Sequence, residues 1–118
     1  MGWDSNPTPT GSIATAIGTG SANTTKILAV LVKNGHAALQ CSNYRGGGYA
    51  DWFLPSKGEL IELYKSRRLV GNLTYDLWSS SEGVGSLTNR AWTLSFRDGI
   101  PNLNYKSDGF GVRAVRAF

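Results

Sequence analysis

The sequence has one cysteine and one histidine in 118 residues, and these scarcities exclude several kinds of protein. Because Cys41 has no second cysteine to pair with, no internal disulfide bond is possible, and the fold must be held together by packing. Cys41 lies in an apolar stretch, which favours a core residue over a nucleophile. His36 has no cysteine or carboxylate at metal-ligand spacing, and we interpret it as a surface or loop residue.

Charged residues and long apolar runs are also scarce. Charged residues make up 17% and hydrophobic residues 41% of the chain, a composition typical of a soluble globular domain. The most apolar stretch, residues 27–32, is far shorter than the roughly 20 residues that span a bilayer, so we expect no membrane insertion in this fragment. The net charge of +4 is spread along the chain rather than gathered in a stripe, which argues against nucleic-acid binding.

Sequence patterns typical of an enzyme or a cofactor site are missing. There is no G-x-S-x-G nucleophile motif. Residues 46–48 are three glycines, but no Lys-Ser or Lys-Thr follows them, so we predict a tight loop with positive φ rather than a phosphate loop. The eight acidic residues are scattered, whereas calcium takes about six to eight oxygen ligands, usually from clustered carboxylates. We therefore expect no enzymatic activity, no cofactor and no metal site.

The first part of the chain predicts an irregular arm followed by helices. Residues 1–21 are punctuated by Pro and Gly and show no helical period, and Trp3 is available to dock on a neighbouring surface. Apolar residues at 27, 28, 31 and 32 predict an amphipathic helix, with Ser21 or Asn23 as its cap. Residues 37–41 suggest a second short helical stretch.

A third helix has the strongest start signal in the sequence. Ser56 and Glu59 have the spacing of a capping box, in which each side chain satisfies the other residue's backbone N–H. Leu60, Leu63 and Tyr64 follow at the spacing of one apolar helix face.

After residue 71 the pattern changes to that of β-strands. Residues 97–99, Arg-Asp-Gly, signal a turn, and Pro101 favours an edge position for the strand that contains it. The order of elements predicts an α+β fold, with two or three N-terminal helices followed by a meandering antiparallel sheet. The candidate strands are residues 77–81, 91–96, 100–105 and 111–118.

Four motifs occur in an order that resembles a bacterial and phage domain family of unknown function, also found at the C-terminus of collagen-like Legionella proteins. They are G-Y-x-D-W-x-L-P-x-x-x-E-L at 48–60, W-S-S-S-E at 78–82, A-W at 91–92 and V-R-x-V-R at 112–116. The resemblance covers about residues 22–118 and implies a C-type-lectin-like fold. The resemblance implies that residues 22–118 form a ligand-binding domain, preceded by the irregular arm of residues 1–21.

A narrower resemblance is to the variable proteins of diversity-generating retroelements, in which a reverse transcriptase copies a template with errors at adenines. Asn codons of the AAY type then become NNY codons. The flanks at 78–82 and 112–118 match, which implies a variable region at about 78–118. Ala91, Trp92, Phe96, Gly99 and Lys106 are interpreted as fixed frame residues within it.

The residue types in this region allow a check, because NNY codons cannot encode Lys, Glu, Gln, Met or Trp. Between Gly83 and Gly111 the only such residues are Trp92 and Lys106, whereas residues 24–70 contain eight of them. An ordinary loop-rich sheet also avoids some of these types, and that alternative stays open here.

The expected anchors of the frame are Trp52, Trp78, Trp92 and Phe96, which would bury large apolar areas. Arg113 and Arg116 are interpreted as residues for ion pairs or packing. The resemblance implies that the residues between the frame positions contact a ligand, since loops tolerate change without disturbing a core. The candidate ligand-binding residues are Val84, Leu87, Arg90, Thr93, Ser95, Arg97, Asp98, Asn102, Asn104, Tyr105, Asp108 and Phe110.

The resulting hypothesis is a non-enzymatic binding protein, displayed on a phage virion or a bacterial cell surface. Its partner would be a protein or a glycan on a target cell, and the sequence indicates no particular oligomeric state. The alternative is an invariant adhesin or structural surface domain of the same fold. An enzyme of the formylglycine-generating type ranks third, because its paired active-site cysteines cannot exist with Cys41 alone.

Overall fold

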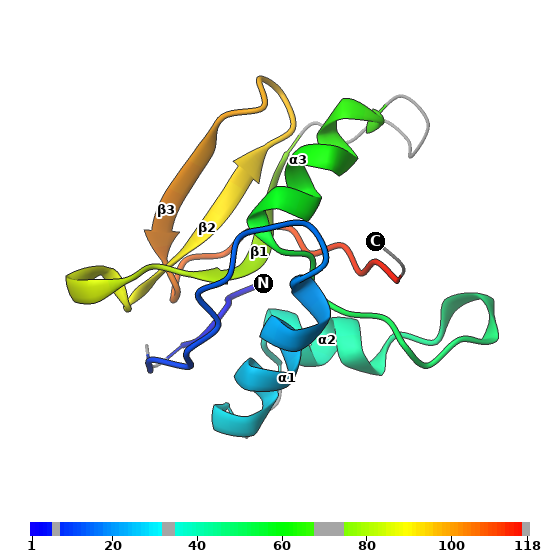
Figure 1. Cartoon of the computed structure of the whole chain (residues 1–118), viewed down its shortest axis with the longest axis horizontal. Coiled ribbons are helices and arrows are strands. Elements are labelled where there is room, and N and C mark those ends of the chain that lie inside the picture. The colour runs from blue at the N-terminus through cyan, green and yellow to red at the C-terminus, as the bar shows by residue number, and fades with distance from the viewer. Residues whose placement is uncertain (6–7, 32–34, 68–74, 117–118) are drawn as a thin grey trace.

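The structure is a computed structural model that describes residues 1–5, 8–31, 35–67 and 75–116. In these residues three α-helices precede a three-stranded antiparallel sheet, so the predicted α+β class and the order of helices before strands are confirmed (Figure 1). No described helix has the length and apolar character needed to cross a membrane. The elements are α1 (Gly20–Val30), α2 (Ala37–Asn43), the short 3-10 helix η1 (Gly46–Gly48), α3 (Lys57–Lys65), β1 (Asp76–Glu82), the 3-10 helix η2 (Gly85–Leu87), β2 (Arg90–Ser95) and β3 (Pro101–Tyr105).

Helix α1 begins earlier than the sequence predicts. Its N-cap is Thr19, which makes no side-chain capping bond, so the predicted caps Ser21 and Asn23 are wrong. Asn23 is buried inside the helix instead, and its Nδ2 donates to the Ala14 carbonyl at 2.7 Å. The early start is possible because residue 20 is glycine: a Cβ there would overlap the Glu59 carboxylate.

Helix α2 lies where the sequence predicts it, and His36, interpreted as a surface or loop residue, lies in the connection before the helix but not on the surface. His36 is buried and caps the helix, because its Nδ1 accepts the Leu39 N–H at 3.3 Å. Its Nε2 lies 3.2 Å from the Leu31 carbonyl, which requires a proton on Nε2. Burial lowers the pKa of His36, since a charged imidazole would lose its hydration there. The ring is therefore neutral when it caps the helix.

The capping box of α3 is confirmed. The Ser56 hydroxyl accepts the Glu59 N–H at 3.3 Å, and the Glu59 carboxylate accepts the Ser56 N–H at 2.9 Å. Glu59 is fully buried, and its second oxygen accepts the N–H groups of Gly18 and Gly20 at 2.8 and 3.3 Å. The local helix signal thus also ties the segment before α1 to the start of α3.

The sheet has the order β1-β2-β3, and Pro101 begins the edge strand as predicted. The predicted turn before β3 is also confirmed, with Gly99 at φ +75°. The fourth predicted strand is wrong: the described residues 111–116 form only isolated bridges, from Gly111 to Leu77 and from Val115 to Phe53. Because the segment leaves β1 within a few residues to meet residue 53, no continuous ladder can form.

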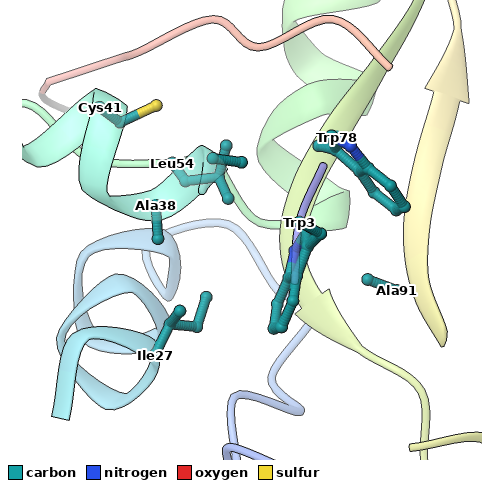
Figure 2. Packing of buried hydrophobic residues seen from close by; sticks show 8 residues of the cluster. Trp3, Ile27, Ala38, Cys41, Leu54, Trp78 and Ala91 are labelled. Carbon is teal, nitrogen blue, oxygen red and sulfur yellow. The ribbon is translucent and has the colours of Figure 1, made fainter. Parts of the chain in front are cut away.

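Two hydrophobic clusters make up the core. Leu60, Leu77, Leu94 and Phe96 fill the space between α3 and the sheet. The other cluster is centred on Trp3, which is only 1% exposed. Figure 2 shows the Trp3 ring among Ile27 of α1, Trp78 and Ala91. The segment predicted to form an irregular arm therefore supplies one of the largest buried side chains, and its Trp3 docks on the rest of the domain.

The predicted aromatic anchors divide into two pairs. Trp78 and Phe96 are buried, as expected. Trp52 and Trp92 are half-buried, so each covers part of its apolar area, as expected of an anchor, but less completely than Trp78 and Phe96 do. Trp92 lies on the sheet face where the Lys57 ammonium stands 3.7 Å above its ring, and this contact covers the indole only in part.

Candidate functional site

The strands β2 and β3 carry many of the predicted ligand-binding residues, and their register assigns them to two faces of the sheet. Thr93 pairs with Asn102 and Ala91 with Asn104. Directly opposed residues share a face, and the Asn104 amide accordingly donates to the Thr93 hydroxyl at 2.8 Å. Trp78 of β1 pairs with Thr93, so it lies on this same face. The two asparagines form the outer edge of that face.

The opposite face carries Arg90 and Tyr105, which pair directly across the two strands. The Arg90 guanidinium donates to the Tyr105 hydroxyl at 3.0 Å and lies 4.4 Å from the centre of its ring. Tyr105 is 48% exposed, so the pair presents an aromatic surface with a held positive charge. Trp92 and Leu103 continue this face toward α3.

Ten of the twelve predicted ligand-binding residues are exposed or half-buried, and two are not. Thr93 is 1% exposed and Ser95 8%, so neither offers a surface to a ligand in this structure. Both point to the face that carries Trp78, where neighbouring side chains cover them. The exposed residues are Val84, Leu87, Arg97, Asp98, Asn102, Tyr105 and Asp108, and the half-buried ones are Arg90, Asn104 and Phe110.

The ten residues do not gather in one pocket. Val84 and Leu87 lie in the β1–β2 connection, at the end of the sheet where Arg90 and Tyr105 meet. Arg97 and Asp98 lie in the β2–β3 turn, at the opposite end of β2. Figure 1 shows these two connections far apart, with β3 running between them. The ten residues are therefore spread over both faces and both ends of the sheet rather than gathered in a concave site.

A shallow groove of about 660 Å³ lies beside the Asp76 end of β1. Two predicted residues line it, Arg97 and Phe110. The Phe110 ring packs edge-on against the buried Trp78, with ring centres 5.0 Å apart, and this contact fixes the position of Phe110 in the groove. The remaining lining residues are Met1, Tyr75, Asp76, Gly109 and Gly111. An aromatic floor with Arg97 and Asp76 on the wall can accept both apolar and polar groups of a partner.

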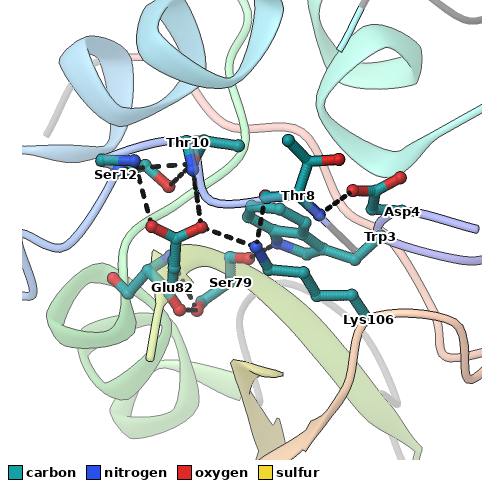
Figure 3. Close-up of polar contacts among 10 residues, drawn as sticks. Trp3, Asp4, Thr8, Thr10, Ser12, Ser79, Glu82 and Lys106 are labelled. Atoms are coloured by element: carbon teal, nitrogen blue, oxygen red, sulfur yellow. Dashed lines mark hydrogen bonds and ion pairs between the residues drawn. The ribbon is translucent and has the colours of Figure 1, made fainter. Parts of the chain in front are cut away.

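A buried ion pair lies at the Glu82 end of β1, opposite the Asp76 end that borders the groove. Lys106, at the end of β3, is fully buried, and its ammonium lies 2.5 Å from the Glu82 carboxylate at the end of β1 (Figure 3). The ammonium also donates to the Thr8 carbonyl at 2.9 Å. Burial lowers the pKa of Lys106, while the hydrogen bond and charge of Glu82 oppose that shift. The pair joins two residues interpreted as frame, one at the end of β1 and one directly after β3.

Glu82 also holds the N-terminal segment. Its carboxylate accepts the N–H groups of Thr10 and Gly11 at 2.8 and 3.0 Å. The Lys106 ammonium lies 4.4 Å from the centre of the Trp3 ring, which adds a cation–π contact to the same cluster. The N-terminal segment is thus fixed by the two side chains of this buried ion pair.

The W-S-S-S-E motif forms a second fixed element, because all five of its residues are buried. Here β1 bulges between Trp78 and Glu82, so the intervening serines turn away from the regular ladder. The Ser79 carbonyl accepts the Trp3 indole N–H at 2.7 Å, and the Ser81 hydroxyl donates to the Ala14 carbonyl at 2.7 Å. Small hydroxyl side chains suit this site because a hydroxyl can donate or accept a hydrogen bond with a neighbouring backbone group.

The structure also shows what the sequence missed. The full burial of Trp3 and the pairing of Glu82 with Lys106 depend on contacts between residues distant in sequence, whereas His36 bonds locally to Leu31 and Leu39. Only the isolated lysine at 106, in a region without other Lys or Glu, signalled a special position. In the described part of the chain, no group of three or more His, Cys, Asp or Glu residues is placed to hold a metal ion. No protein family, curated protein or solved structure matches the chain.

Proposed function

We propose that this chain is a non-enzymatic ligand-binding domain of C-type-lectin-like fold whose last third is a changeable surface on a fixed frame. In this proposal a diversity-generating retroelement varies the surface residues. The domain would be displayed on a phage virion or bacterial cell surface and bind a protein or glycan on a target cell.

The observation that carries the proposal is the division between buried and exposed positions within residues 83–111. Of the five residues interpreted from the sequence as frame, Ala91, Phe96 and Lys106 are buried and Trp92 and Gly99 are half-buried, whereas seven of the twelve predicted contact residues are exposed and three are half-buried. A region that varies must keep such a division, because a substitution in a packed core is costly and one on a surface is not.

Lys106 links this division to the codon argument. NNY codons cannot encode lysine, and the one lysine in the region is the residue whose replacement would leave the Glu82 carboxylate buried beside an empty space. The side chains on the surface support binding as well. Tyr105, Arg90 and Asn102 combine contact area with adaptable hydrogen bonds, which is typical of binding surfaces that recognise varied partners.

A display experiment tests the proposal. One library randomises Val84, Arg90, Asn102, Asn104 and Tyr105, and a matched library randomises five exposed positions of α1, namely Ser21, Thr25, Lys26, Ala29 and Val30. Both are selected against the same panel of purified proteins and glycans. We expect folded, specific binders from the first library and few from the second.

Two outcomes would count against the proposal. If most members of the first library fail to fold, the positions belong to the frame. If wild-type protein binds one member of the panel and every substitution in the five positions abolishes that binding, an invariant adhesin explains the chain better.

A further inference from the structure

A second concavity lies away from the proposed variable surface. It has a volume of about 270 Å³ and lies between α2, the loop of residues 44–52 and the C-terminal extended segment. None of its lining residues belongs to the predicted contact set. They are Gln40, Cys41, Tyr44, Trp52, Val112, Arg113 and Ala114.

One wall of this pocket is aromatic, and the three-glycine loop builds it. The Tyr44 ring packs edge-on against Trp52, with ring centres 4.9 Å apart. The Trp52 indole N–H donates to the Gly46 carbonyl at 3.1 Å, which fixes the indole and leaves its apolar surface for the pocket. A Cβ on Gly46 would overlap the Tyr44 ring, and Gly47 and Gly48 have positive φ as predicted. The glycines thus let both rings lie close to the backbone.

Contacts with the C-terminal segment hold the same loop from its other side. Arg116 donates to both Asp51 carboxylate oxygens, at 2.7 and 3.1 Å, and its guanidinium lies 3.5 Å from the centre of the Tyr49 ring. The prediction of ion pairs or packing is confirmed for Arg116, whereas Arg113 is exposed and forms no salt bridge among the described residues. A loop fixed at both sides gives a pocket that exists before a ligand arrives, which lowers the entropic cost of binding.

The polar groups of the pocket favour an anion. Arg113 is exposed and lines the pocket, and no acidic residue lines it within the described chain. Asp51, the one carboxylate of the 44–52 loop, is already paired with Arg116. Burial raises the pKa of the Cys41 thiol to about 12, so this wall is uncharged at neutral pH. A guanidinium offers paired donors that match the geometry of a carboxylate.

From these features we propose that the pocket binds a small organic anion, a planar ring that carries one carboxylate. The ring would lie against Trp52 and Tyr44, and the carboxylate would reach the Arg113 guanidinium. This site is separate from the proposed target-binding surface, because its lining residues lie either before residue 78 or in the matching flank at 112–118, and none is a position proposed to vary. Its ligand would therefore stay the same while the target changes.

Titration of the full chain with benzoate tests this site, followed by two-dimensional NMR of backbone, indole and arginine N–H groups. For a ligand this small we expect a dissociation constant in about the millimolar range. The largest shifts should occur at the Trp52 indole and at Arg113. Benzyl alcohol, which keeps the ring and lacks the charge, should bind at least about fivefold more weakly, because it cannot form a charge-assisted hydrogen bond.

Two variants separate charge from shape. Arg113→Gln should weaken benzoate binding to the level of benzyl alcohol, while Arg97→Gln, at the other groove, should leave it unchanged. Gly46→Ala should weaken both ligands, because it displaces the Tyr44 ring.

The proposal is overturned if benzoate and benzyl alcohol bind alike, or if Arg113→Gln has no effect. Shifts confined to the Arg97 groove, or no saturable shifts at all, would also overturn it. The dispersion of each variant's spectrum shows whether it is folded, so a loss of binding cannot be confused with unfolding.

Discussion

The ammonium of Lys106 lies 2.5 Å from the carboxylate of Glu82, and both side chains are almost completely buried. Glu82 is the last residue of β1 and Lys106 directly follows β3, so the ion pair connects the two outer strands of the sheet that carries the proposed variable residues. The Glu82 carboxylate also accepts the Thr10 and Gly11 N–H groups, and these hydrogen bonds attach the N-terminal segment to the ion pair.

Replacing Lys106 by Met should destabilise the fold strongly. It leaves the Glu82 carboxylate buried without its cation, and removing one partner of a buried pair costs about 3–5 kcal/mol in the free energy of unfolding. Urea denaturation measures this loss. Lys26→Met, at an exposed position of α1, is the matched control. Adding Glu82→Gln to Lys106→Met should recover part of the loss, because no buried charge remains. A loss below about 1 kcal/mol for Lys106→Met would contradict the account.

The N-terminal segment should be essential to stability. Trp3→Ala removes a fully buried indole together with its hydrogen bond to the Ser79 carbonyl, and truncating a buried aromatic residue costs about 3–5 kcal/mol. Ile13→Ala, at an exposed position of the same segment, should change stability by less than about 0.5 kcal/mol. Equal effects of the two substitutions on the thermal midpoint would show that Trp3 does not pack in the core.

Stability should fall as the pH drops through the range in which an ordinary histidine gains its proton. The folded-state pKa of His36 is lowered, so its contribution is fully present above the pKa of the unfolded chain and is lost as the pH falls toward the folded-state pKa. A protonated His36 also cannot accept the Leu39 N–H. His36→Asn keeps a good N-cap that does not titrate and should flatten this part of the curve. Urea denaturation at pH 7 and pH 5 compares the two proteins, and parallel losses would assign the pH dependence to another group.

Two glycines in the last third should differ in their tolerance of alanine. Gly99 and Gly85 both have positive φ, at +75° and +61°, so each Ala substitution carries backbone strain of about 1 kcal/mol or more. A Cβ at Gly99 would also meet the Tyr64 ring at 2.5 Å, whereas a Cβ at Gly85 would meet open space. Gly99→Ala should therefore lower the thermal midpoint further than Gly85→Ala. Equal shifts would mean that the Tyr64 ring yields freely.

The parts of this fold that could be predicted are those with a local signal. The capping box at Ser56 and Glu59, the strand alternation in β2 and the Pro at the start of β3 each involve residues close in sequence. The error at 111–116 has the opposite cause. Those residues alternate like a strand, but a strand needs a continuous neighbour, and their partners are residues 77 and 53 in turn. No local pattern carries that information.

The candidate surface shows the same limit. Its exposed loops could be assigned from the resemblance and from residue types, and ten of the twelve positions reach the surface. Thr93 and Ser95 do not, because the face of β2 to which they point is covered by Trp78 and its neighbours. The sequence indicates that Trp3 can dock on a neighbouring surface, but its full burial could not be predicted, because a Trp in a Pro- and Gly-rich segment shows no period that would reveal it.

The most direct test of the central claim is to sequence the gene and the DNA around it. The account predicts a nearby reverse transcriptase gene and a repeat that matches the codons for residues 78–118 and differs only at template adenines. It also predicts that the codons for residues 83, 84, 87, 90, 93, 97, 100 and 102–105 all end in C or T. Codons at these positions that end in A or G, with no matching repeat, would contradict the claim that this surface is diversified.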